Sequence, residues 1–247
     1  MTKTVNYTIR GIMLSASIFS WFAAGQVGAH ANFKPFPNMP GKDARSYVEG
    51  SSAYLELSLS HGCKGADGGH LATTDTAVVF PNAVDLGENT YTEDGDGNRY
   101  AGNPVMSIKP SIDNRWHGLM NPSGPVKPFY SHGLREKDVR ALHWHGGHVP
   151  DDHFALLSFS ATFPKLAGCT QRLRVYFPTV QYCEGGVAMG WIREATAKWP
   201  EDLISPGYAP YVDVVRDTSA NPLPASCGGS GETIEAYPSA EDIDRYL

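Results

Sequence analysis

The sequence predicts an all-β sandwich. Short runs of alternating, β-branched or aromatic residues recur along the 247-residue chain, and turns rich in glycine and proline separate them. No segment carries a sustained apolar stripe with the 3.6-residue period of an amphipathic helix. These two observations favour packed antiparallel sheets over alternating strands and helices around a parallel sheet.

The expected strands follow one another at short spacing. Segment 54–59 alternates strictly, as Tyr-Leu-Glu-Leu-Ser-Leu, and is typical of a half-buried strand. The other expected strands are 76–81, 105–110, 139–145, 156–163, 173–177 and 187–194. Segment 91–104 is polar and glycine-rich and predicts a loop. Segment 194–198 predicts a short turn of helix.

Residues 1–29 have the pattern of a secretory signal peptide. Lys3 and Arg10 precede the apolar stretch 12–24, and small residues at 27 and 29 form a cleavage site. Cleavage after Ala29 would make His30 the first residue of a periplasmic or secreted protein. The string 29–31, Ala-His-Ala, fits a competing site whose use would discard His30.

The mature chain divides into a sandwich domain, 30–217, and an extension, 218–247. The extension is rich in Ser, Gly, Pro and acidic residues and is expected to be loosely ordered. No second apolar run approaches the ~18 residues that a membrane span requires. We therefore expect no membrane span in the mature chain.

Charge and motifs narrow the functional classes. The chain has a net charge of −6 and no basic patch, which argues against nucleic-acid and anionic-membrane partners. The nucleophile elbow G-x-S-x-G, the zinc-protease motif H-E-x-x-H and the phosphate-binding loop are all absent from the sequence. The sequence therefore favours a binding protein over an enzyme.

The chain has four cysteines, at 63, 169, 183 and 227. An even number in an exported chain predicts two disulfides. Four cysteines allow three connectivities, and the residues by themselves leave all three open.

Histidines supply the candidate metal ligands. As an N-terminal residue, His30 could chelate one ion through its α-amine and Nδ1, and Cu²⁺ has the highest affinity in the divalent series for nitrogen ligands. A second candidate is the string 143–148, His-Trp-His-Gly-Gly-His. On a strand, His143 and His145 would share one face and Trp144 would take the other. His148 or His153 could then approach across the turn. The loop 94–98 resembles the start of a calcium loop, but it lacks the required Gly and Glu.

Several strings occur together in collinear order. They are GSSAY at 50–54, SHGC at 60–63, ATT at 72–74, VFPNAV at 79–84, HWHGG at 143–147, PDDHF at 150–154 and YFPTVQYCE at 176–184. With His30 at the start and Trp191 at the end, this series resembles the YcnI-like family of exported copper-binding proteins. The resemblance extends from His30 to about residue 215.

The resemblance implies an immunoglobulin- or cupredoxin-like β-sandwich that holds Cu(II) in a brace formed by a single histidine. The brace carries over to His30, and the family's tryptophan near the copper carries over to Trp191. The family's two cysteine positions carry over to Cys63 and Cys183, which implies a Cys63–Cys183 disulfide and leaves Cys169–Cys227 as a second one.

This chain departs from the family pattern at the position of the carboxylate ligand. A gap-free match puts Ala53 where some members have Glu, and Glu49, Glu56 and Asp152 are the replacements to consider. The expected function is a periplasmic copper chaperone or buffer that exchanges Cu(II) with other copper-handling proteins. The alternatives are an oxidative copper enzyme, with His143, His145 or His153 as second ligand, and a metal-free binding module.

Overall fold

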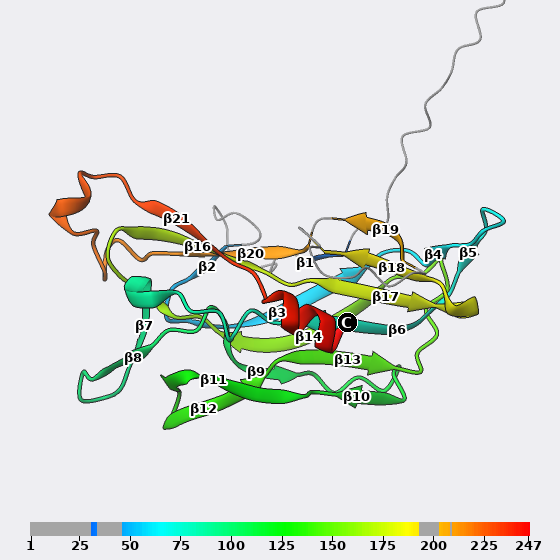
Figure 1. Cartoon of the computed structure of the whole chain (residues 1–247), viewed down its shortest axis with the longest axis horizontal. Helices are drawn as coiled ribbons and strands as arrows, with labels where there is room; N and C mark the ends of the chain where they lie inside the picture. Colours follow the sequence, from blue (N-terminus) through cyan, green and yellow to red (C-terminus); the bar gives the residue numbers. More distant parts are fainter. Residues whose placement is uncertain (1–30, 34–45, 193–202, 208) are drawn as a thin grey trace, which may run out of the picture.

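Two layers of strands pack face to face in the computed structural model, which describes residues 31–33, 46–192, 203–207 and 209–247 (Figure 1). The predicted all-β sandwich is confirmed. Within the described residues the single α-helix is α1 (Ala240–Tyr246), and three 3₁₀ turns occur at Gly87–Asn89, Glu184–Gly186 and Ala225–Cys227. No described helix has the length and apolar character needed to cross a membrane.

The first layer is a four-stranded sheet in the order β1-β3-β14-β9. Its strands are β1 (Asn32–Phe33), β3 (Ser52–Leu59), β14 (Ala155–Thr162) and β9 (Met106–Pro110). Burial along β14 alternates at every residue, as a strand with one face in a core requires. In the β3–β14 pairing Leu57 lies opposite Leu157, so both strands direct their apolar sets to the same side.

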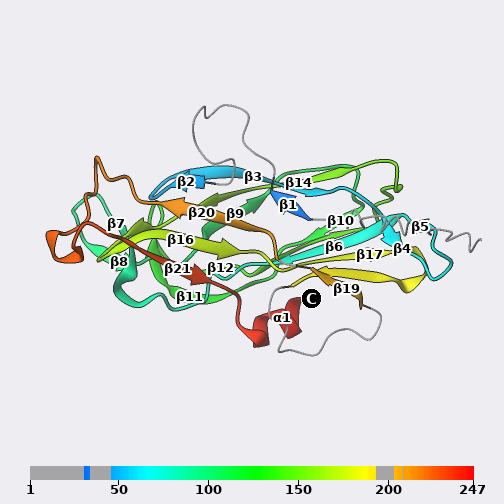
Figure 2. The same ribbon diagram turned by 90° about the horizontal axis from the view of Figure 1, so that it is seen from above.

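The second layer consists of two sheets, and the chain runs from one directly into the other (Figure 2). One has the order β10-β13-β6-β17-β18-β19 and the other β2-β20-β16-β21. Strand β16 ends at Tyr176 and β17 begins at Thr179, so the chain passes directly from one sheet to the other. The strands are β2 (Ser46–Val48), β6 (Thr73–Val79), β10 (Gly118–Met120), β13 (Ala141–His145), β16 (Thr170–Tyr176), β17 (Thr179–Cys183), β18 (Ala188–Trp191), β19 (Leu203–Gly207), β20 (Tyr211–Val215) and β21 (Glu232–Ala236).

Four phenylalanines join the layers at the centre of the core. The ring of Phe33 on β1 lies 4.9 Å from that of Phe177, and Phe80 lies 5.3 Å from Phe159, both in edge-on arrangements. Fully burying a side chain of this kind stabilises a fold by about 1.5–3 kcal/mol. The aromatic contacts explain why the two-residue strand β1 is held against the edge of the first layer.

Smaller hairpins project from the sandwich. They are β4–β5 (Cys63–Lys64 and His70–Leu71), β11–β12 (Ser123–Tyr130 and Leu134–Val139) and β7–β8 (Thr90–Glu93 and Arg99–Ala101), the last extended by β15 (Lys165–Leu166). The prediction of a loop at 91–104 was therefore wrong in part. Its glycine-rich centre is the turn of a hairpin, and the Asp94 carboxylate accepts bonds from the backbone N–H groups of Asp96 and Asn98.

The C-terminal segment also differs from the prediction. Instead of a loosely ordered extension, 218–247 contains β21, which pairs in parallel with β16, and helix α1. Ile243 of α1 packs on Val180 and Ala188, on the face of the second layer that points away from the core. Disulfide Cys169–Cys227 attaches the segment to the start of β16, and the second disulfide is Cys63–Cys183, so the expected pairing is confirmed.

Candidate functional site

The described chain begins one residue after the predicted N-terminal ligand. The signal segment 1–29 and His30 lie outside the described residues. Ala31 is 3% exposed and belongs to the main core, and Asn32 pairs with Ser58 on β3. Continuing this antiparallel register by one residue sets Ala31 opposite Leu59, the last residue of β3.

Three segments meet just beyond Leu59. Residues 60–62 continue from β3, the turn 150–153 leads into β14, and β4–β5 follows immediately. The pairing of Leu59 with Ala155 brings the first two segments together. Disulfide Cys63–Cys183 fixes β4 to the end of β17. In Figure 1 the β4–β5 hairpin marks this end of the molecule, on the right.

A carboxylate shared by two imidazoles lies at this end. Asp151 Oδ1 accepts a bond of 3.1 Å from the Gly62 N–H, and it lies 2.6 Å from His70 Nδ1 and 3.9 Å from His61 Nδ1. All three side chains are between 36% and 45% exposed. We call His61, His70 and Asp151 the Asp151 cluster. The cluster was not predicted from the sequence, although the GADGG string at 65–69 signals the tight turn that brings His70 back beside Lys64.

The carboxylates that the sequence analysis considered lie elsewhere. Glu49 is buried, and its oxygens accept from the N–H groups of Leu166 and Asp217. Asp152 is 81% exposed and contacts His153 at 2.6 Å. Ala53 is six residues from Leu59, a separation of about 20 Å along a strand. Glu56 is half-buried, three residues back from Leu59 on β3.

The predicted histidine pair has the expected orientation. The rings of His143 and His145 stack 5.9 Å apart on one face of β13, whereas Trp144 is 1% exposed on the core face. His145 Nδ1 lies 3.2 Å from Asp75 Oδ1. Burial, with a smaller contribution from the His145 ring, lowers the pKa of His143. His148 lies beside Glu184 and His153 beside Asp152, so neither completes a site with the pair.

Trp191 is separated from this histidine pair by the sheet itself. The register aligns His143 with Ala77 and Val180, and aligns Trp191 with Thr179 and Val78 in the adjacent row. Adjacent rows face opposite sides of a sheet. Trp191 is 3% exposed in the same core cluster as Ala31, and its ring packs so closely on Gly207 that a Cβ there would lie 2.5 Å from the ring.

Within the described ranges, no group of three or more His, Cys, Asp or Glu side chains is arranged to hold a metal ion. In the Asp151 cluster the two imidazole Nδ1 atoms lie 2.6 Å and 3.9 Å from one carboxylate oxygen, as ion-pair contacts. The Asp94 turn is likewise occupied by its own bonds, including one of 3.0 Å from the Tyr100 hydroxyl.

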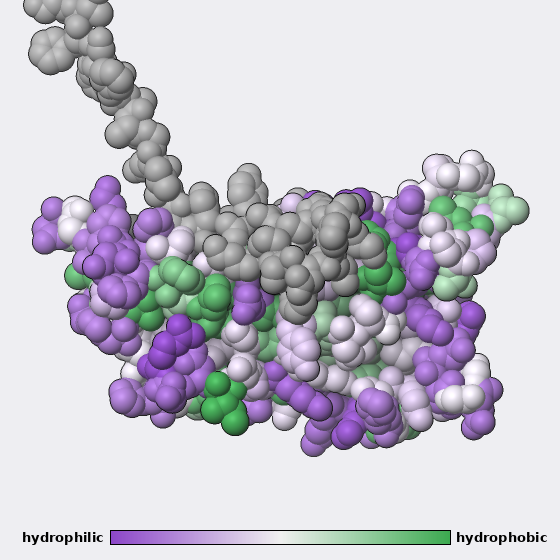
Figure 3. Space-filling view, turned by 180° about the vertical axis from the view of Figure 1, so that it is seen from behind, coloured by the Kyte–Doolittle hydropathy of each residue, from purple (hydrophilic) through white to green (hydrophobic). Residues whose placement is uncertain are grey.

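The surface around these groups is mainly polar. The face in Figure 3 is largely hydrophilic, with small separate apolar patches. The exposed large apolar side chains of the described residues are scattered along the sequence: Tyr54, Ile112, Leu119, Met120, Leu134 and Phe154. Single exposed apolar residues are normal in folded proteins.

The known proteins that are similar to this chain include a protein family and a solved structure. No curated protein matches the chain. A crystal structure of an uncharacterized protein from Nocardia farcinica, described as having an immunoglobulin-like fold, is 15% identical, with a TM-score of 0.39 over 68% of this chain and 91% of that chain. Residues 100–214 match the family described as a domain of unknown function, DUF1775, which is the family that includes YcnI-like proteins.

Proposed function

We propose that the mature protein binds one Cu(II) ion through the α-amine and Nδ1 of His30 and buffers or delivers copper outside the cytoplasm, without catalysing a reaction. The proposal is supported by the collinear motifs, by the family match over 100–214 and by two disulfides, which are typical of exported proteins. The observation that carries it is the position of Ala31.

Ala31 favours one of the two cleavage sites. Its side chain is 3% exposed in the main core, beside a strand that pairs with β3. Cleavage after Ala31 would delete this buried residue, whereas cleavage after Ala29 would keep it and leave His30 as the free N-terminus. Because consecutive Cα atoms are about 3.8 Å apart, an ion held by His30 would lie close to the end of β3.

The Asp151 cluster is the best source of a carboxylate partner for this ion. Asp151 lies at the Leu59 end of β3, and the register sets Ala31 at the same end. Ala53 lies about 20 Å from Leu59 along that strand. Carboxylate oxygen and imidazole nitrogen both suit Cu(II). We therefore assign Asp151 as the third ligand, or as the group that orients His61 or His70 toward the ion, in place of Asp152. Trp191 belongs to the same core cluster as Ala31, and its place near the ion rests on the family resemblance.

Copper titration of the mature protein tests the proposal. We expect His30→Ala to weaken Cu(II) binding by at least a hundredfold while leaving the thermal midpoint of the apoprotein unchanged. His153→Ala removes an exposed histidine near the cluster and is the matched control, with no expected loss. An affinity that survives in His30→Ala and is lost in His143→Ala/His145→Ala would move the site to β13 and contradict the histidine brace.

A further inference from the structure

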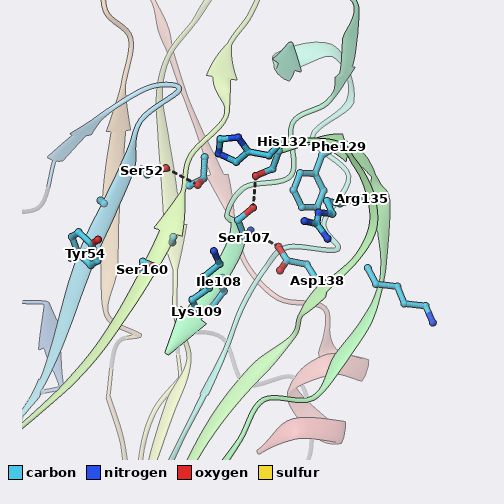
Figure 4. A pocket seen from close by; sticks show the side chains of 15 residues that line it. Ser52, Tyr54, Ser107, Ile108, Lys109, Phe129, His132, Arg135, Asp138 and Ser160 are labelled. Carbon is cyan, nitrogen blue, oxygen red and sulfur yellow. Dashed lines mark hydrogen bonds between the residues drawn. The ribbon is translucent and has the colours of Figure 1, made fainter. Parts of the chain in front are cut away.

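A second, unrelated site lies between the first layer and the β11–β12 hairpin. It is a pocket of about 430 Å³, within the usual range for small-ligand sites (Figure 4). Ser52, Tyr54 and Ser160 line it from the sheet side, and His132 and Arg135 line it from the hairpin side. Strand β9 forms the base between them, with Ser107 and Lys109.

The pocket gathers cations that have no internal partner. Among the described residues, Arg135, Lys109 and Lys137 have no ion pair or hydrogen bond to their charged groups. Arg135 is unusual in this respect, since every other described arginine has an ion-pair or hydrogen-bond partner. These partnered arginines are Arg99, Arg115, Arg140, Arg172, Arg174, Arg216 and Arg245.

The single acidic group in the lining does not neutralise these cations. Asp138 is 8% exposed and accepts bonds of 2.7 Å from the Ser107 N–H and 2.9 Å from the Val139 N–H. Its carboxylate is thus used to hold the backbone. The local charge is positive on a chain whose net charge is −6.

The backbone around the pocket is held in an unfavourable conformation. Ser107 and His132 both have φ of 53°, and they are the two non-glycine residues with positive φ among those described. Non-glycine residues in this region of φ are strained, and such residues concentrate at binding sites. The Asp138 bond to the Ser107 N–H and a 2.8 Å bond between the Ser107 and Ser131 hydroxyls hold this geometry.

The remaining polar groups are hydroxyls. Ser52 and Thr162 share a bond of 2.9 Å, and Ser160 and Tyr54 lie beside them. Hydroxyls both donate and accept, so they suit a ligand that itself carries several hydroxyl groups. Arginine recognises carboxylates with two parallel bonds, and lysine adds a point charge.

We propose that this pocket binds a small polyhydroxylated carboxylate, an acidic sugar or sugar acid, with its carboxylate on Arg135 and Lys109 and its hydroxyls on the serine-lined wall. The site is independent of copper binding, since none of its residues belongs to the Asp151 cluster.

Calorimetric titration with D-glucuronate tests the proposal, with D-glucose as the neutral ligand of the same ring size and inorganic phosphate as the bare anion. We expect glucuronate to bind at least tenfold more tightly than glucose or phosphate. Arg135→Ala should reduce glucuronate affinity at least tenfold and Arg135→Lys by less. Arg245→Ala, which removes an exposed arginine from α1, should change nothing.

Chemical shifts keep the test independent of folding defects. Glucuronate should shift the backbone amides of Ser107 and Ser131 in the wild type and not in Arg135→Ala, whose other amides should be unchanged. Absence of glucuronate binding, equal binding of glucose, stronger binding of phosphate, or unchanged affinity in Arg135→Ala would each overturn the proposal.

Discussion

Two groups of histidines in this protein differ in how they are assembled. His143 and His145 are two residues apart on one strand, stack on the outer face of β13 and are half-buried. His61 precedes the short β4–β5 hairpin and His70 is the first residue of β5. Both lie beside Asp151, which is 81 residues further along the chain than His70. Local spacing produces the first group, and strand pairing together with a disulfide produces the second.

The two groups also differ in how clearly the sequence shows them and in where they lie in the fold. The histidine pair is the clearer signal in the sequence, yet it lies across the sheet from Trp191 and faces no free N-terminus in the described ranges. The Asp151 cluster lies where β1 begins. Its two histidines lie beside one carboxylate, that of Asp151.

The largest expected effect concerns the disulfide that holds the Asp151 cluster. Its cysteines are 120 residues apart, and loop-closure entropy gives about 5 kcal/mol for such a crosslink, against about 4 kcal/mol for the 58-residue separation of Cys169 and Cys227. Cys63→Ala/Cys183→Ala should lower the free energy of unfolding by that larger amount, measured by denaturant titration. A loss below about 1 kcal/mol would show that the end of β3 is held by other contacts.

The two faces of β13 should differ almost as strongly. Trp144→Ala removes a buried side chain and should cost about 3–5 kcal/mol in the free energy of unfolding. His143→Ala, on the outer face, should cost less than about 1 kcal/mol. Equal losses in the two variants would contradict the assignment of inner and outer faces.

The adjacent aspartates Asp151 and Asp152 provide the sharpest contrast for copper. Asp151→Asn keeps the size of the side chain and removes the charge shared by His61 and His70, and it should weaken Cu(II) binding by about 10–100-fold. Asp152→Asn changes an exposed side chain that contacts His153, and should have no effect. Equal affinities of the two variants, measured by competition with a chelator, would remove the cluster from the copper site.

The smallest effect is a pH dependence of the metal-free protein. Because burial lowers the pKa of His143, the unfolded chain takes up its proton at a higher pH than the folded chain. The free energy of unfolding should therefore be unaffected well above the ordinary histidine pKa of about 6.5 and fall as the pH drops below it. His143→Gln should lessen that fall, and NMR titration should give a pKa for His143 below 6.5. A pKa above that value would contradict its burial.

The sequence predicted those parts of the fold that local pattern determines. The alternating run in β3 and the apolar residues of β14 and β16 identified their strands, because one buried face imposes a period of two. Helix α1 has seven residues, too few to show a helical period, although Ser239 caps it by accepting from the Asp242 N–H. Strand β21 was missed because its pairing with β16 is long-range and parallel.

In the candidate site, too, local spacing predicted one group of residues and not the other. The shared face of His143 and His145 followed from their spacing, and the outcome agrees. The Asp151 cluster could not be found by spacing. The β3–β14 pairing brings the turn 150–153 to the end of β3, and within that turn Asp151 rather than Asp152 lies against Gly62 and His70.

The most direct test of the central claim is electron paramagnetic resonance of Cu(II) bound to the exported, processed protein, compared with a variant that has one glycine inserted between Ala29 and His30. The insertion keeps the imidazole but converts the α-amine of His30 into an amide. We expect mass spectrometry to give His30 as the first residue of the wild type. Its spectrum should show one amine and one imidazole nitrogen, and the insertion should change that spectrum, because the amine and the imidazole then belong to different residues. A mature N-terminus at Asn32, or identical spectra from the two proteins, would contradict the histidine brace.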